Sequence, residues 1–171
     1  MAESIKNFFV NLFGATYGDK IAVFLCSMLP IIELRGSIPL GAACGIPWYL
    51  NYIISVIGNM LPVPFVLLLI KKILEWMKTT KVFSKFALWL EARAEKSKGR
   101  LEKGVFIGLV LFVAIPIPGT GAWTGSLLAA LAGIKFKKSI LAILIGVLLA
   151  GVIMTLASYG VVGFLEFLKK T

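Results

Sequence analysis

Long apolar runs separated by short polar or helix-breaking segments dominate the chain. Residues 48–70 and 139–160 are predominantly apolar, and each is long enough to cross a membrane as a helix, which takes about 20 residues. The other apolar runs are too short to cross, so we expect them to be paired as the arms of re-entrant hairpins. These shorter runs cover residues 21–29, 39–46, 104–118 and 126–134. The pattern predicts an all-α integral membrane protein with a single membrane domain.

The segments outside these runs are amphipathic. Apolar residues at helical spacing in residues 1–20 predict a short interfacial helix, which Gly14, Gly18 and Asp19 should end. Residues 71–103 combine aromatic and basic side chains and predict a cytoplasmic amphipathic helical region; a soluble regulatory helix is the alternative. Residues 161–171 form the tail.

Three polar residues interrupt the first spanning run at a regular interval. Asn51, Ser55 and Asn59 are four residues apart, so they share one face of a helix. They either hydrogen-bond to a neighbouring helix or form a cavity wall, and the spacing leaves both interpretations open. Pro62 and Pro64 should kink the distal part of this helix.

An acid and a base lie two residues apart inside the first apolar hairpin. Glu33 and Arg35 are flanked by Pro30, Gly36 and Pro39, residues that disfavour a continuous helix. Ionisable residues are expensive at that depth in a membrane and therefore mark a functional site by default. In a regular helix two side chains at this spacing point apart, so direct contact between them requires a non-helical tip.

The two charged side chains have different candidate roles. Glu33, in a poorly solvated tip, is the candidate carrier of a coupling proton. Arg35 keeps its charge under ordinary conditions and would pair with Glu33 or with an anionic substrate. The alternative is a permanent ion pair that only holds the hairpin in place.

The two halves of the chain align at an offset of 88 residues. Matched pairs include Phe24 with Phe112, Pro30 with Pro118, Gly45-Ile46 with Gly133-Ile134, and Ile57-Gly58 with Ile145-Gly146. Each half consists of one hairpin and one spanning helix and crosses the membrane once, so successive copies should point in opposite directions. The alignment predicts an inverted repeat, whose transport site lies at the repeat interface near the membrane midplane.

The second hairpin tip lacks charge. It offers backbone amides, hydroxyl groups and an aromatic wall, and the helices that follow both tips would point their positive ends into the membrane. Its candidate site residues are Pro118, Gly119, Thr120, Gly121, Trp123 and Thr124.

Composition and charge agree with a membrane location. Of 171 residues, 59% are hydrophobic and 15% are charged, against about 45–50% and 25% for a soluble domain. The net charge of +10 comes from basic segments that flank apolar runs, namely ten Lys and Arg against four Glu in residues 71–103 and a second cluster at residues 135–138. This is the positive-inside pattern, so we expect cytoplasmic basic segments and no nucleic-acid partner.

The chain offers little for catalysis or metal binding. It contains no histidine, and its two cysteines, Cys26 and Cys44, lack metal-ligand spacing. With Glu33 as the single buried acid, no nucleophile and base can be paired, which disfavours an enzyme acting on lipid phosphate. We expect no cofactor and no metal.

The two tips carry a family resemblance. Glu33-Leu34-Arg35-Gly36-Ser37-Ile38-Pro39 and residues 116–125 resemble the two signature motifs of the small multidrug export protein family, a distant branch of the DedA superfamily. The resemblance covers residues 20–160. It implies two facing re-entrant hairpins in a multi-pass protein of a prokaryotic inner membrane, moving a solute or lipid. DedA relatives are associated with proton-coupled transport and with undecaprenyl phosphate recycling. Their acidic residue corresponds to Glu33, whereas Trp123 and Thr124 occupy the region of their basic residues.

The sequence therefore favours a transporter or flippase for a small amphiphilic or anionic solute or lipid, with proton coupling through Glu33 as a further hypothesis. An uncoupled lipid scramblase or a membrane-organising protein is the alternative. Arg35 favours an anionic, lipid-phosphate-like substrate, whereas Glu33 with Trp123 suits a lipophilic, drug-like cation. Expected partners are membrane lipids, protons and further copies of the chain, since thin bundles with broken helices must be shielded from lipid.

Overall fold

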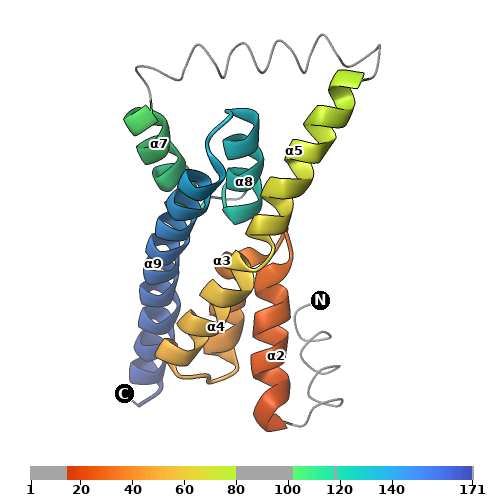
Figure 1. The fold of residues 1–171 in the computed structure, drawn as a ribbon. Coiled ribbons are helices and arrows are strands. Elements are labelled where there is room, and N and C mark those ends of the chain that lie inside the picture. The colour runs from red at the N-terminus through yellow and green to blue at the C-terminus, as the bar shows by residue number, and fades with distance from the viewer. Residues whose placement is uncertain (1–14, 80–101, 118, 171) are drawn as a thin grey trace. The chain divides into compact units, whose positions relative to one another are not determined.

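The computed structural model describes residues 15–79, 102–117 and 119–170, which form helices joined by turns. Two compact units divide the chain. Residues 1–61 and 147–171 belong to the first unit, and residues 62–146 belong to the second. The helices, labelled in Figure 1, are α2 (Ala15–Met28), α3 (Glu33–Ala43), α4 (Trp48–Met60), α5 (Val63–Thr79), α7 (Glu102–Ala114), α8 (Ala122–Leu131) and α9 (Phe136–Lys170).

In the first unit, α2, α3 and α4 pack against one another (Figure 1). The fully buried apolar side chains include Val23 on α2 with Leu34 and Ile38 on α3. Gly58 of α4 lies against α2 so closely that a Cβ atom there would meet the Phe24 carbonyl oxygen at 2.7 Å. A glycine is needed at this crossing because backbone approaches backbone.

In the second unit, α8 packs against both α5 and α7. Gly146, in the part of α9 that belongs to this unit, lies against α7, where a Cβ atom would meet the Val110 carbonyl oxygen at 2.9 Å. Gly125 of α8 lies similarly close to the Val113 side chain. Small residues thus set the helix spacing here as well.

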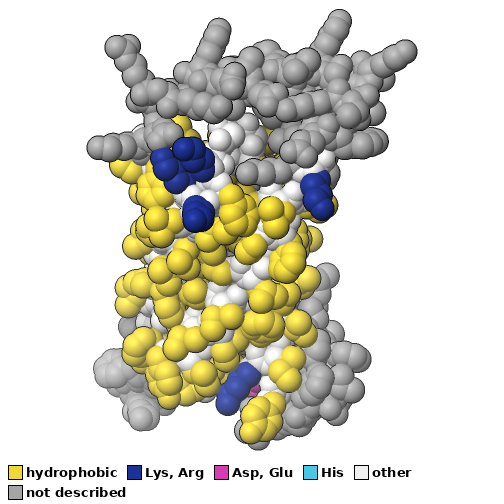
Figure 2. All heavy atoms as spheres, viewed as in Figure 1, with side chains coloured by type: hydrophobic (Ala, Val, Ile, Leu, Met, Phe, Trp, Pro, Cys, Tyr) yellow, Lys and Arg dark blue, Asp and Glu magenta, His cyan; other side chains and the backbone are white. Residues whose placement is uncertain are grey.

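Two helical segments are long and apolar enough to cross a membrane. They are Trp48–Ile70 and Phe136–Val161. The two predicted spanning runs are therefore confirmed as span-capable. The first contains a break at Leu61 and Pro62, between α4 and α5, close to where the prolines predict a kink. Hydrophobic side chains cover most of the described surface on the face shown in Figure 2.

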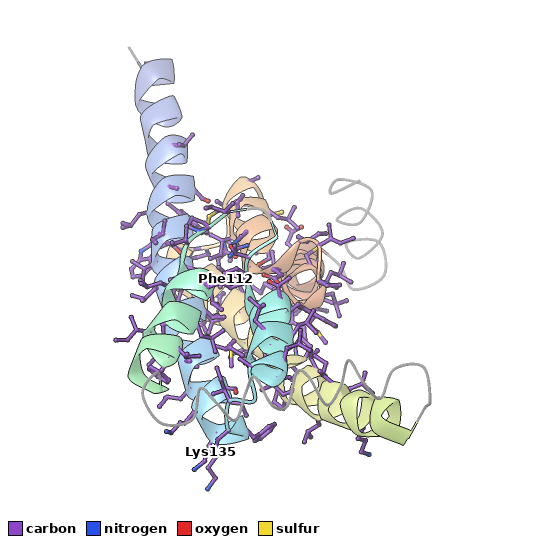
Figure 3. All side chains as sticks on the ribbon, turned by 90° about the horizontal axis from the view of Figure 1, so that it is seen from above. Phe112 and Lys135 are labelled. Carbon is purple, nitrogen blue, oxygen red and sulfur yellow. The ribbon has the colours of Figure 1, made fainter. Side chains whose placement is uncertain are left out.

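The helix boundaries recur at the offset of 88 residues found in the sequence. The pairs α3 and α8, and α4 and α9, begin within one residue of that offset. Gly45 and Gly133 both have left-handed backbones, with φ of 72° and 68°, and follow helices with matching terminal hydrogen bonds. Phe112, labelled in Figure 3, lies on α7 where the offset pairs it with Phe24 on α2.

Several predicted boundaries were wrong. The first arm begins at Ala15, and Gly18 and Asp19 lie inside α2, because packing of its buried face outweighs the weak helix preference of these residues. Two other segments are helical without contradicting their predictions: residues 71–79 continue α5, and residues 161–170 of the predicted tail continue α9. The interfacial helix predicted in residues 1–20 and the amphipathic region of residues 71–103 lie largely outside the described residues.

The first predicted tip is longer than the observed turn, and the second is displaced along the chain. Gly36 and Pro39 lie within α3, so the chain breaks only over residues 29–32. Gly36 is tolerated because the Ile32 side chain occupies the place of its missing Cβ atom. In the second hairpin, α8 already begins at Ala122, so Trp123 and Thr124 belong to its first turn and not to the tip.

Candidate functional site

Glu33 is the first residue of α3 and lies buried at the tip of the first hairpin. Its side chain is 5% exposed, and its backbone φ is 50°. It is the one residue other than glycine with a positive φ in the described ranges 15–79, 102–117 and 119–170. Such a conformation costs on the order of 1–3 kcal/mol and concentrates at functional sites. An acidic side chain is thus held in a strained, poorly solvated position.

The short turn before Glu33 is closed by backbone hydrogen bonds. The Glu33 N–H donates to the Leu29 carbonyl oxygen at 2.9 Å, and the Gly36 N–H donates to the Ile32 carbonyl oxygen at 3.0 Å. Pro30 lies exposed within this turn. The turn therefore starts α3 at Glu33 and determines where its carboxylate enters the helix bundle.

Arg35 lies half-buried two residues further along α3. The charge of the Glu33 carboxylate acts electrostatically on the Arg35 guanidinium group. Both residues belong to α3, whose first residue, Glu33, departs from helical φ where the chain turns in from α2. The structure therefore places the non-helical turn before this pair, at residues 29–32, and Arg35 lies inside the helix.

The polar stripe of α4 faces α3. Ser37 on α3 donates a hydrogen bond to Ser55 at 2.8 Å, and Ser55 donates to the Asn51 Oδ1 atom at 3.4 Å. The Asn51 Nδ2 atom donates to the Ile38 carbonyl oxygen at 2.8 Å. For Asn51 and Ser55, these bonds agree with the first interpretation of the stripe, in which its residues hydrogen-bond to a neighbouring helix.

Tyr159 of α9 completes this buried network, and it was missed in the sequence analysis. Its hydroxyl group accepts a hydrogen bond from the Asn51 Nδ2 atom at 3.0 Å and donates to the Ile46 carbonyl oxygen at 2.5 Å. Gly151, two turns earlier, lies against Tyr52 and Leu34. The one sequence signal that could have indicated Tyr159 is its position eight residues after Gly151, on the same face of an apolar helix.

Asn59 differs from the other members of the stripe. Its side chain is 2% exposed, yet its Oδ1 atom has no hydrogen-bond partner in the part of the chain that the structure describes. A buried amide oxygen without a donor typically costs about 1–3 kcal/mol, so an arrangement of this kind calls for an explanation. Helix packing alone does not supply one.

The second tip, in the other unit, is held by its own backbone and hydroxyl groups. Thr120 donates to the Ile115 and Ile117 carbonyl oxygens at 2.8 and 2.9 Å, and Gly119 has a left-handed φ of 85°. Gly121 precedes α8 in an extended conformation with φ of 153°, which suits glycine. The Thr124 hydroxyl donates to the Gly121 carbonyl oxygen at 3.4 Å.

The predicted site residues thus fall into two groups. The first unit holds Glu33, Arg35, Pro30, Gly36, Asn51 and Asn59, and the second unit holds Gly119, Thr120, Gly121, Trp123 and Thr124. Pro118 lies outside the described residues. The first group combines the buried acid, the base and the unpartnered amide oxygen, so it is the stronger candidate for solute binding.

Comparisons with known proteins agree with the resemblance of the tip motifs. Residues 33–153 match the sequence model of the family described as "Putative small multi-drug export protein". The matched range begins at Glu33 and includes Asn59 and the second tip. No curated protein and no solved structure matches the chain.

Proposed function

Because the chain belongs to the small multi-drug export protein family, we propose that it is a membrane transporter or flippase that moves a small amphiphilic or anionic solute or lipid. The observation that carries this proposal is the strained, 95% buried Glu33 beside Arg35 in an apolar hairpin. A buried ionisable pair is expensive in a membrane protein and is typically kept for the transported solute or ion.

The proposed membrane arrangement rests on helix lengths. With 11 residues in α3 and 10 in α8, these helices reach about 15–17 Å, roughly half of a hydrocarbon core of about 30 Å. Each would therefore form a re-entrant hairpin with the helix before it. Opposite orientation of the two halves would make an inverted repeat, and the relation to the DedA superfamily belongs to the same proposal.

In the proposed mechanism, Glu33 and Arg35 have separate roles. The Glu33 carboxylate exchanges a coupling proton against the solute, while Arg35 pairs with Glu33 when the site is empty and balances its charge. The left-handed backbone of Glu33 marks a strained start of α3 at the carboxylate. A prokaryotic inner membrane, where a proton gradient exists, is the proposed location.

Reconstitution of the purified protein into vesicles tests the function. Vesicles with an imposed proton gradient would be assayed with two probes, the cationic dye ethidium and a fluorescent polyprenyl phosphate. We expect gradient-dependent movement of one of them, which Glu33→Gln abolishes. Asp19→Asn, the same change at the acidic residue of α2, should leave it intact.

Movement that is independent of the gradient in every variant would instead indicate an uncoupled scramblase. Gradient-driven movement by Glu33→Gln at the unaltered rate would contradict the assignment of Glu33. Movement of neither probe, together with normal folding, would count against transport of both substrate classes and favour a membrane-organising protein.

A further inference from the structure

The unpartnered Asn59 oxygen has a definite place along the packed pair α3 and α4. Two contacts set the register of this pair. Gly41 lies against the Asn51 side chain, and Ser37 is hydrogen-bonded to Ser55. From the first contact to the second, α3 steps back by four residues while α4 advances by four. One further step in the same direction reaches Glu33 on α3 and Asn59 on α4.

The side chain of Asn59 faces this position because of its helical spacing. Asn51, Ser55 and Asn59 share one face of α4, and the first two are hydrogen-bonded to α3 from that face. Gly58, the neighbour of Asn59, lies against Phe24 and Ser27 near the end of α2. Asn59 therefore lies where α2 ends and α3 begins, level with the buried Glu33.

We propose that Asn59 and Glu33 together form a binding site for the N–H groups of a protonated amine. The Asn59 oxygen accepts one hydrogen bond from the ammonium group, and the Glu33 carboxylate accepts another and neutralises the positive charge. This inference rests on the proposed function, because it assigns the solute to the same site. It selects an amine among the amphiphilic solutes that the function allows.

The chemistry of the two groups supports a donor ligand. Both side chains present oxygen acceptors in a poorly solvated place, and hydrogen bonds from an ionised donor are about twice as strong as neutral ones. In this proposal the half-buried Arg35 side chain turns away from Glu33 when an ammonium group replaces it. The Asn59 oxygen then gains the donor that the protein does not supply.

A matched pair of ligands isolates the Asn59 hydrogen bond. Benzylammonium and benzyltrimethylammonium carry the same charge and ring, but only the first has N–H donors. Calorimetric titration of the purified protein at pH 7 should show tighter binding of benzylammonium. In Asn59→Leu that preference should fall by about ten-fold or more, with little change for benzyltrimethylammonium.

The unfolding temperature distinguishes a ligand-binding Asn59 from a purely structural one, because the two roles predict opposite changes in Asn59→Leu. Asn59→Leu removes an unpartnered buried oxygen, so its unfolding temperature should be equal to or above that of the unaltered protein. The matched variant Asn51→Leu breaks three observed hydrogen bonds and should lower it. Together these results separate a ligand-binding amide from a structural one.

Three results would overturn the inference. They are an unaltered preference in Asn59→Leu, a loss of stability in Asn59→Leu comparable to that of Asn51→Leu, and equal or absent binding of the two ligands by the unaltered protein. All three leave the proton-driven vesicle assay unaffected and therefore do not refute the proposed function. The proposed function fails separately, if the unaltered protein moves neither probe in that assay.

Discussion

Replacing Gly146 by alanine should destabilise the protein through a contact that cannot relax. The added Cβ atom would lie 2.6 Å from the Val113 Cβ atom and 2.9 Å from the Val110 carbonyl oxygen. Neither atom can move by side-chain rotation, because one is a backbone atom and the other is attached directly to it. The helices α7 and α9 must therefore separate, and overpacking of this kind typically costs about 1–3 kcal/mol.

Gly160→Ala is the matched control on the same helix. A Cβ atom at Gly160 meets nothing within 4 Å in the described structure. Both substitutions gain the helix preference of alanine over glycine, which is worth up to about 1 kcal/mol. Their difference in unfolding free energy therefore isolates the overpacking cost, and we expect Gly146→Ala to be less stable than Gly160→Ala by about 1–3 kcal/mol.

Reversible unfolding in mixed micelles, titrated with a denaturing detergent and followed by circular dichroism, measures both free energies. The reasoning predicts that Gly160→Ala is at least as stable as the unaltered protein. Equal stability of the two variants would refute the close approach of α7 and α9 at Gly146. It would also weaken the account of Gly58, which meets α2 in the same manner.

Three further predictions concern the network, the topology and the assembly. Tyr159→Phe should lower the unfolding free energy by about 1–3 kcal/mol in the same titration, because the Ile46 carbonyl oxygen loses its donor and Asn51 loses an acceptor. An unchanged unfolding free energy would contradict the network. Both basic segments should be cytoplasmic. A cysteine introduced by Lys137→Cys, in a background without Cys26 and Cys44, should therefore not react with an impermeant thiol reagent in intact cells. Labelling from outside would contradict this topology. We expect a homodimer or larger oligomer, which light scattering in detergent measures and a monomeric mass at all concentrations would refute.

Much of the helical framework was predictable because hydropathy and helix breakers act locally. The two span-capable segments follow from long apolar runs, and the break at Pro62 follows from the missing backbone donor. The 88-residue offset paired Gly58 with Gly146 from sequence alone. The structure supplies the physical reason, since each glycine lets its helix approach a carbonyl oxygen of a neighbouring helix.

The details of the site depended on contacts that a linear sequence does not display. Gly36 and Pro39 suggested a broken arm, but tertiary packing keeps α3 helical through both. Tyr159 is 108 residues from Asn51, so its hydrogen bond could not be read from spacing. The polar stripe was predicted as one set. The structure separates it into Asn51 and Ser55, which are hydrogen-bonded, and Asn59, whose oxygen has no partner among the described residues.

The central claim is that Glu33 and Arg35 form the working site and are not merely a structural ion pair. If they are only structural, Glu33→Gln leaves the half-buried Arg35 cation without its partner, which costs up to about 3–5 kcal/mol, and adding Arg35→Gln should restore stability. The most direct measurement is proton-driven transport by the double variant Glu33→Gln with Arg35→Gln in reconstituted vesicles, with its fold checked by circular dichroism. Our account predicts a folded protein without coupled transport. A folded double variant with full proton-driven activity would contradict it.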